Sequence, residues 1–185
     1  YRIPNSSSFE VNIMTTNPVN TYEYEEIAKQ RIDKGEYDFI AGAATDEITL
    51  RRTRAVFDSI MMKPRMMVDV SERDLSTTVL GNKISFPVIM APAGNHSAAH
   101  PDAELATAKA AGRMDTLMAL SSHASRTMED VAEVATGPLW FQYYFFKDRE
   151  LTLDMAKRAE DAGYSALVVT LDAKIKPKRE RNLRN

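Results

Sequence analysis

The fold of this chain is decided by "ALVVTLD", residues 166–172. The run is apolar and rich in β-branched residues, which is typical of a strand buried in a sheet. It ends on Thr170 and Asp172, two side chains that can form hydrogen bonds where the strand stops. An amphipathic stretch at 149–162 precedes it, so the sequence predicts a strand that follows a helix.

The same arrangement recurs upstream. The other strands that we expect are "PVIMAPA" (87–93), "LMALSS" (117–122) and "LWFQYYF" (139–145). Helices are expected between them at 101–112 and 127–135. Pro101 suits the first position of its helix, and Thr127 suits the N-cap of the next. Strands that alternate with helices predict an α/β fold with a parallel sheet and right-handed crossovers. Four such units can form a small doubly wound sheet or half of an eight-stranded barrel.

The residues before these units form separate segments. We divide the chain into an extended N-terminal segment at 1–20, a helical segment with a hairpin at 21–86, and the strand–helix units at 87–185. Helices are expected at 21–33, with Thr21 as the N-cap, and at 36–60, with a break at Gly42. The stretch "TTVLGNKISFP" places Gly81-Asn82 between two β-branched runs, which predicts a tight hairpin that serves as a plug or lid.

Composition limits the classes to which the chain can belong. With 185 residues, 44% of them hydrophobic, it suits one globular domain with a sizeable core. A formal net charge of −2 does not suit a partner such as nucleic acid, and no apolar run approaches the roughly 20 residues of a membrane span. The absence of cysteine excludes disulfides and thiolate metal sites. The chain begins with Tyr1 rather than Met and shows no signal-peptide pattern, so we expect a cytoplasmic protein with a trimmed N-terminus.

Polar groups gather at the ends of the predicted strands. They are the backbone at Ala93-Gly94, Ser121, Gln142 with Tyr144, and Thr170 with Asp172. In parallel α/β folds ligands bind at the carboxyl ends of the strands, so these groups define the expected site. Neutral donors and acceptors suit the edge of an uncharged heteroaromatic ring. No metal is expected, because His96, His100 and His123 lack the spacing of ligands, and no Gly-rich phosphate loop is present.

Four stretches, read in order, carry a family resemblance. They are "DEITLRRTRAVFDSIMMKPRMMVDVSERDLSTTVLGNKISFPVIMAPAG", "HPDAELATAKAA", "LWFQYYFFKDRE" and "RAEDAGYSALVVTLDAKIKPKRERNLRN". From about Tyr22 to Asn185 the chain resembles the N-terminal half of the FMN-dependent 2-hydroxy acid oxidases and dehydrogenases. That family includes glycolate oxidase, lactate oxidase, lactate monooxygenase and mandelate dehydrogenase.

The resemblance implies a TIM-type (β/α)8 barrel with FMN as cofactor at its carboxyl-end mouth. This chain would supply the first four strand–helix units and stop in the loop after strand 4. A complementary C-terminal half, on a second chain or in a missing segment, would supply the histidine base and the phosphate site. The implied reaction is the oxidation of a small L-2-hydroxy acid, such as lactate, glycolate or mandelate, to the 2-oxo acid by a homotetramer of complete barrels.

The resemblance also implies roles for individual residues. The turn Ala91, Pro92, Ala93 and Gly94 would face the flavin, and Ser121, Gln142 and Thr170 would bond to its pyrimidine edge. The implied catalytic residues are Tyr144, whose hydroxyl would meet the substrate, Asp172, which would orient the histidine base, and Arg179, which would approach the substrate carboxylate. We expect the remaining cations of the tail, Lys176, Lys178, Arg181 and Arg184, to form a solvated basic run.

Several positions depart from the family pattern. Phe39 replaces a tyrosine that donates to the substrate carboxylate, and His123 replaces the tryptophan of glycolate oxidase. Gly94 replaces the alanine of glycolate and lactate oxidases, as glycine does in mandelate dehydrogenase and lactate monooxygenase. We expect the missing methyl to leave room for a larger substrate side chain or a retained intermediate. In the loop after Asp172, the departures are Lys174, Pro177 and Asn182. The expected substrate pocket thus consists of Phe39, Gly94, His123, Tyr144 and Arg179.

Two other functions fit parts of the sequence. A non-catalytic barrel relative, retained for binding or assembly, would explain the missing hydroxyl at Phe39 and the altered loop. A Schiff-base enzyme would use Lys174 at the end of a strand, although that lysine follows a flavin-type motif.

Overall fold

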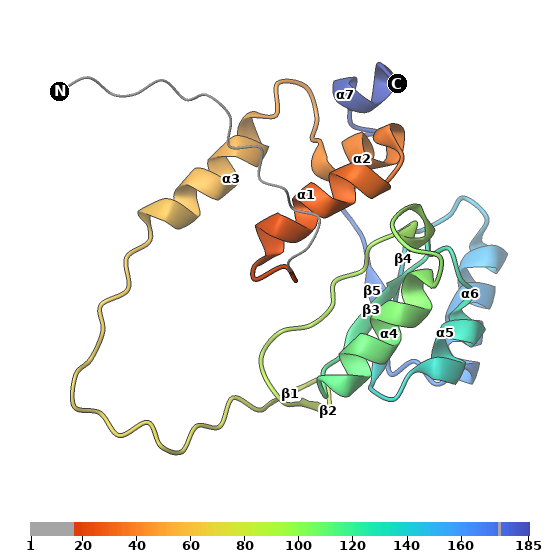
Figure 1. The fold of residues 1–185 in the computed structure, drawn as a ribbon. Helices are drawn as coiled ribbons and strands as arrows, with labels where there is room; N and C mark the ends of the chain where they lie inside the picture. The colour runs from red at the N-terminus through yellow and green to blue at the C-terminus, as the bar shows by residue number, and fades with distance from the viewer. Residues whose placement is uncertain (1–16, 174) are drawn as a thin grey trace.

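The computed structural model describes residues 17–173 and 175–185 (Figure 1). The helices are α1 (Thr21–Arg31), α2 (Lys34–Ala41), α3 (Ile48–Ser59), α4 (Ala103–Arg113), α5 (Met128–Val134), α6 (Arg149–Asp161) and α7 (Glu180–Leu183), with a 3-10 turn at His96–Ala98. The strands are β1 (Thr77–Val79), β2 (Asn82–Ile84), β3 (Met118–Ser121), β4 (Leu139–Tyr143) and β5 (Ala166–Val169). Figure 1 shows β3 to β5 packed with α4 to α6, while α1 to α3 lie outside this unit and α7 lies beside α2.

Strands β3, β4 and β5 form a parallel sheet in the order in which they occur in the sequence. Helix α5 connects the first pair and helix α6 the second, so the predicted alternation and parallel pairing are confirmed. A doubly wound sheet reverses its strand order at a switch point, whereas this order does not reverse within the described residues. The order therefore favours an arc of a barrel over the doubly wound alternative.

The predicted strand at 87–93 is reduced to a single bridge. Met90 pairs with Met118, accepting from the N–H of Ala119 at 2.9 Å and donating to the carbonyl of Leu117 at 2.9 Å. Pro87 and Pro92 bracket this segment and lack N–H donors, which limits the ladder that it can form. The expectation of a full strand here is therefore wrong for the described structure.

The core lies between the sheet and the helices α4 to α6. Leu120 and Phe141 point into it and are almost fully buried. Ala108 on α4 belongs to the same cluster, and its small side chain lets the helix approach the sheet closely. Because side chains alternate along a strand, the neighbouring Ser121 and Gln142 face the opposite side of the sheet. The packing of the core thus determines which residues are free to form a site.

Side chains define where several helices begin. The hydroxyl of Thr127 accepts from the N–H of Asp130 at 3.1 Å, which confirms the predicted N-cap of α5. Asn20, rather than Thr21, caps α1, because its side chain accepts from two N–H groups of the first turn. Pro101 does not occupy the first helical position, since α4 begins at Ala103.

The region between α1 and the sheet follows the predicted pattern with one shift. The helical stretch 36–60 is divided into α2 and α3, and Gly42 is the C-cap of α2, as expected from its position. In the hairpin Val79 pairs with Asn82, so the turn is Leu80-Gly81 rather than Gly81-Asn82. Both turn residues have positive φ, 45° and 80°, as two-residue hairpins of the primed type require.

The hairpin closes the amino-terminal end of the sheet. Ser85 donates from its N–H to the carbonyl of Asp115 at 2.9 Å, just before β3. Asn82 donates to the hydroxyl of Ser165 at 3.1 Å, just before β5. Ile84 is buried beside these contacts. The hairpin therefore acts as a plug at the end opposite the polar strand ends, and it is not a lid over them.

Within residues 17–173 and 175–185, no helix is both long and apolar enough to cross a membrane.

Tyr164 offers a test of the core. Its hydroxyl donates to the carbonyl of Met128 at 2.9 Å, and burial raises the pKa of the phenol, so the group remains a donor. Tyr164→Phe should lower the free energy of unfolding by about 0.5–1.5 kcal/mol, measured by urea unfolding of the assembled protein. Tyr24→Phe, on an exposed side chain of α1, is the matched control and should change little. An equal effect of the two substitutions would contradict the role of this bond.

Candidate functional site

Three neutral polar side chains form a row at the carboxyl ends of the strands. Ser121 and Gln142 are register partners on β3 and β4, and both are buried. The Nε2 of Gln142 donates to the hydroxyl of Thr170, just beyond β5, at 2.8 Å. The parallel register therefore brings together the three residues that the sequence predicted for a flavin edge. Their groups can both donate and accept, but none carries a charge.

A cavity of about 670 Å³ lies at the same end of the sheet. It brings together six of the predicted residues, Phe39, Pro92, Gly94, Ser121, His123 and Tyr144. The rings of His123 and Tyr144 meet edge to face, with centroids 5.1 Å apart. The lining of the cavity thus combines polar and aromatic side chains, as expected for a site that binds a small organic ligand.

The other predicted site residues do not line the cavity, among them Gln142, Thr170 and Arg179. Ala91 and Ala93 are exposed in the turn after the Met90 bridge. Asp172 is exposed beyond β5. Lys174, the Schiff-base candidate, lies outside the described residues. In the part of the chain that the structure describes, no cluster of three metal-binding side chains is present.

The contact between Gly94 and His123 corrects one expectation. A Cβ atom added to Gly94 would lie 2.8 Å from the Cβ of His123 and 3.0 Å from its carbonyl oxygen. The N–H of Asn95 donates to that same carbonyl at 3.0 Å. The space beside Gly94 is therefore filled by the loop that carries His123 and is not left for a larger substrate.

A buried glutamate, Glu104, joins the loop that contains His96 to the loop that contains Ser125. Glu104 is fully buried, and its Oε1 accepts from the N–H of His96 at 3.1 Å and from the N–H of Ser125 at 2.9 Å. Burial raises the pKa of the carboxyl, but the N–H groups of Ser125 and His96 outweigh it, so the net pKa lies below its ordinary value. Its Oε2 has no partner among the described residues. Sequence reasoning missed Glu104, because an acidic residue in the first turn of a helix is ordinary.

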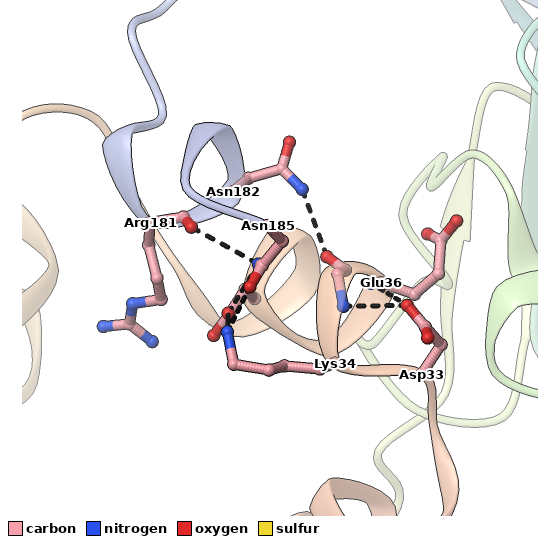
Figure 2. A network of polar contacts seen from close by, with 8 residues as sticks. Asp33, Lys34, Glu36, Arg181, Asn182 and Asn185 are labelled. Carbon is pink, nitrogen blue, oxygen red and sulfur yellow. Dashed lines mark hydrogen bonds and ion pairs between the residues drawn. The ribbon is translucent and has the colours of Figure 1, made fainter.

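The segment 178–185, which we call the strap, lies against α2. Figure 2 shows its polar contacts: Asn182 donates to the carbonyl of Gly35 at 3.1 Å, and Asn185 donates to the carboxylate of Asp38 at 2.7 Å. Hydrogen bonds from Lys34 and Asn185 lower the pKa of Asp38. Asn182, one of the departures from the family pattern, therefore binds the backbone of α2.

The strap holds Arg179 against Phe39, a residue that lines the cavity. One guanidinium nitrogen of Arg179 donates to the carbonyl of Phe39 at 2.7 Å, and its Cζ lies 4.5 Å from the centroid of the Phe39 ring. The neighbouring cations behave differently: Lys178 and Arg184 pair with Glu180, and Arg181 pairs with Glu47 at 2.6 Å. Lys176, Lys178, Arg181 and Arg184 are all exposed, as expected for a solvated run. Among the described residues, Arg179 has no carboxylate partner, so its charge is fixed in place but not neutralised.

These features define an α/β protein with a polar and aromatic site at the carboxyl ends of parallel strands, and comparison with known proteins identifies the family. Residues 28–185 match the family described as FMN-dependent dehydrogenase. Glycolate oxidase 3 of Arabidopsis thaliana is 44% identical over 166 residues, which cover 90% of this chain and 45% of the relative. L-lactate oxidase of a Nostoc species is 44% identical over 174 residues, which cover 92% of this chain and 48% of the relative.

Solved structures agree with the sequence comparison. A soluble mutant of the membrane-associated (S)-mandelate dehydrogenase from Pseudomonas putida superposes with a TM-score of 0.86 at 37% identity. The match covers 91% of this chain and 48% of that one. The chain belongs to the FMN-dependent dehydrogenase family, and it spans about half the length of the relatives that it matches.

The Gly94 contact gives a testable prediction. Gly94→Ala should force the His123 loop to shift, because the contacted atoms are a Cβ and a backbone oxygen that cannot rotate away. Overpacking of this kind costs about 1–3 kcal/mol. We expect a lower melting temperature of the assembled enzyme and a loss of kcat/KM that is similar for small and large 2-hydroxy acids. A selective loss for large substrates at an unchanged melting temperature would restore the original expectation.

Glu104 gives a second testable prediction, because substitutions can remove its charge and its hydrogen bonds separately. Glu104→Gln keeps an oxygen that can accept both N–H groups, whereas Glu104→Ala removes two part-buried hydrogen bonds to a carboxylate, at about 1.5–3 kcal/mol each. The alanine variant should lose much more stability and cofactor affinity than the glutamine variant, measured by thermal unfolding and flavin titration. Equal losses would show that the charge, and not the tie between the loops, is what matters.

Proposed function

We propose that this chain is the N-terminal half of a (β/α)8 flavoenzyme that oxidises an L-2-hydroxy acid to the 2-oxo acid. The observation that carries the proposal is the neutral row of Ser121, Gln142 and Thr170 at one end of the sheet. Ser121 lines the same cavity as Tyr144 and Phe39, and Phe39 in turn contacts the unneutralised Arg179. The family of FMN-dependent dehydrogenases supports both the cofactor and the class of reaction.

The residues present fit the ring edge of FMN. A flavin edge alternates carbonyl acceptors and N–H donors, and the side chains of Ser121, Gln142 and Thr170 can supply both kinds of partner. The hydrogen bond from Gln142 to Thr170 orients the amide, so that its carbonyl oxygen remains available to accept. When bound, FMN would accept the two electrons that the substrate loses. The protein would position the ring and tune it through these bonds.

The substrate would be recognised by its carboxylate and its hydroxyl. Arg179 offers a guanidinium whose present partners are all neutral, and such a group gains most from a carboxylate. Tyr144 lines the cavity and would place its hydroxyl near the substrate. Asp172, exposed beyond β5, would face the histidine base of the other half and favour its cationic form after it accepts the substrate proton.

Exposed apolar surface supports a complementary half as the partner. Leu167 and Val169 on the edge strand β5 are exposed, although such residues are usually buried within a sheet. The segment between α3 and the hairpin exposes four methionines, Met61, Met62, Met66 and Met67. Patches of this kind in a soluble protein mark surfaces that contact another part of the molecule or another chain. Assembly of complete barrels into a homotetramer belongs to the same proposal and rests on the family resemblance.

Reconstitution tests this function. Residues 1–185 produced alone should neither hold FMN tightly nor turn over, whereas production together with the C-terminal half of a family member should give a yellow complex. Anaerobic addition of a 2-hydroxy acid should bleach that complex and yield the 2-oxo acid. A yellow complex that no 2-hydroxy acid bleaches would favour a non-catalytic relative. Stoichiometric FMN on residues 1–185 alone would refute the requirement for the second half.

A further inference from the structure

Phe39 lies between the strap and the cavity. It lines the cavity at the carboxyl ends of the strands, and it also lines a second cavity of about 840 Å³ beside the strap, which Asn182 and Asn185 border. The guanidinium of Arg179 lies over the Phe39 ring and donates a hydrogen bond to the carbonyl of Phe39. One residue of α2 therefore lines both cavities and contacts the cation of Arg179.

The partners of Arg179 fix its position without neutralising it. Besides Phe39, the carbonyl of Gly42 accepts from the same guanidinium nitrogen, with a donor–acceptor distance of 3.4 Å. Both carbonyls belong to the end of α2, where the helix dipole is negative. Carbonyls and an aromatic face attract a cation but leave its net charge available to an incoming anion.

Contacts on either side of Arg179 fix the position of the strap against the α2–α3 region. The N–H of Thr45 donates to the carbonyl of Lys178 at 2.9 Å, immediately before Arg179. Arg181 forms its ion pair with Glu47, which is a half-buried residue before α3. Arg179 is thus flanked by two contacts that join the strap to the α2–α3 region. These contacts fix the backbone on either side of Arg179 and so keep its guanidinium over the Phe39 ring.

We infer that Phe39 is a positioning residue for Arg179 and that it acts on substrate binding through that cation. The inference rests on the proposed function and deepens it, since it says how the carboxylate of a 2-hydroxy acid is recognised without a hydroxyl at position 39. The ring and carbonyl of Phe39 hold the guanidinium beside a residue that lines the cavity. The replacement of a hydrogen-bond donor by phenylalanine therefore moves carboxylate recognition to Arg179 and does not abolish it.

Three variants of the assembled enzyme test this assignment. Phe39→Leu removes the aromatic face but keeps an apolar side chain, and Phe39→Tyr keeps the face. Phe57→Leu is the matched control, because Phe57 on α3 is 66% exposed and contacts no cation that the described structure records. Phe39→Leu should raise KM for a 2-hydroxy acid about three- to thirtyfold with little change in kcat, which is the range of a lost cation–π contact. The corresponding 2-hydroxy amide, which has no charge, should show no such rise.

A second measurement does not depend on turnover. Trypsin cleaves after arginine and lysine, so the rate of cleavage after Arg179 in the substrate-free protein reports how often the strap leaves α2. Phe39→Leu should accelerate this cleavage, whereas Phe39→Tyr and Phe57→Leu should not. An unchanged rate in Phe39→Leu would overturn the inference even if the enzyme is active, and the digestion can be read even if the proposed reaction fails. Faster cleavage with an unchanged KM, or an equal rise in KM for the acid and the amide, would overturn the link to carboxylate binding.

Discussion

The parallel pairing of β3, β4 and β5 is the constraint on which the rest of the structure depends. Parallel strands place all their carboxyl ends at one edge, and the register aligns Ser121 with Gln142 on the face away from the helices. If the register of β4 shifted by one residue, the buried aromatic Phe141 would exchange faces with Gln142. The same hydrophobic packing that stabilises the sheet therefore keeps the neutral polar row together.

Much of the fold could be predicted from the sequence, because its signals are local. Alternating apolar runs and amphipathic stretches marked β3 to β5 and α4 to α6, and Thr127 marked the start of α5. The length of the strand around Met90 could not be predicted from local signals, since it depends on pairing with other strands, and within the described residues Met90 pairs only with Met118. The turn at Leu80-Gly81 was displaced by one residue, because glycine tolerates positive φ and its presence does not settle which neighbour shares the turn.

The sequence predicted which residues gather at the site, but it did not predict how they contact one another. Residue types at strand ends and the family resemblance pointed to Ser121, Gln142 and Thr170, and the register brings them together. No sequence pattern could show that Glu104 joins two loops or that the backbone of His123 fills the space at Gly94. Both are contacts across the fold between residues far apart in sequence, which local propensity does not encode.

The order of the strands also bears on how the chain folds. Each strand pairs with the strand one helix away, as Met118 does with Leu139 and Trp140 with Ala166, so the contacts are short in sequence for a parallel sheet. Pairing strands that are near each other in sequence costs less loop entropy than pairing distant ones. The α4–β5 unit could therefore assemble early during synthesis, while its edge strands await pairing. In that interval the exposed edges would be the points most vulnerable to misassociation.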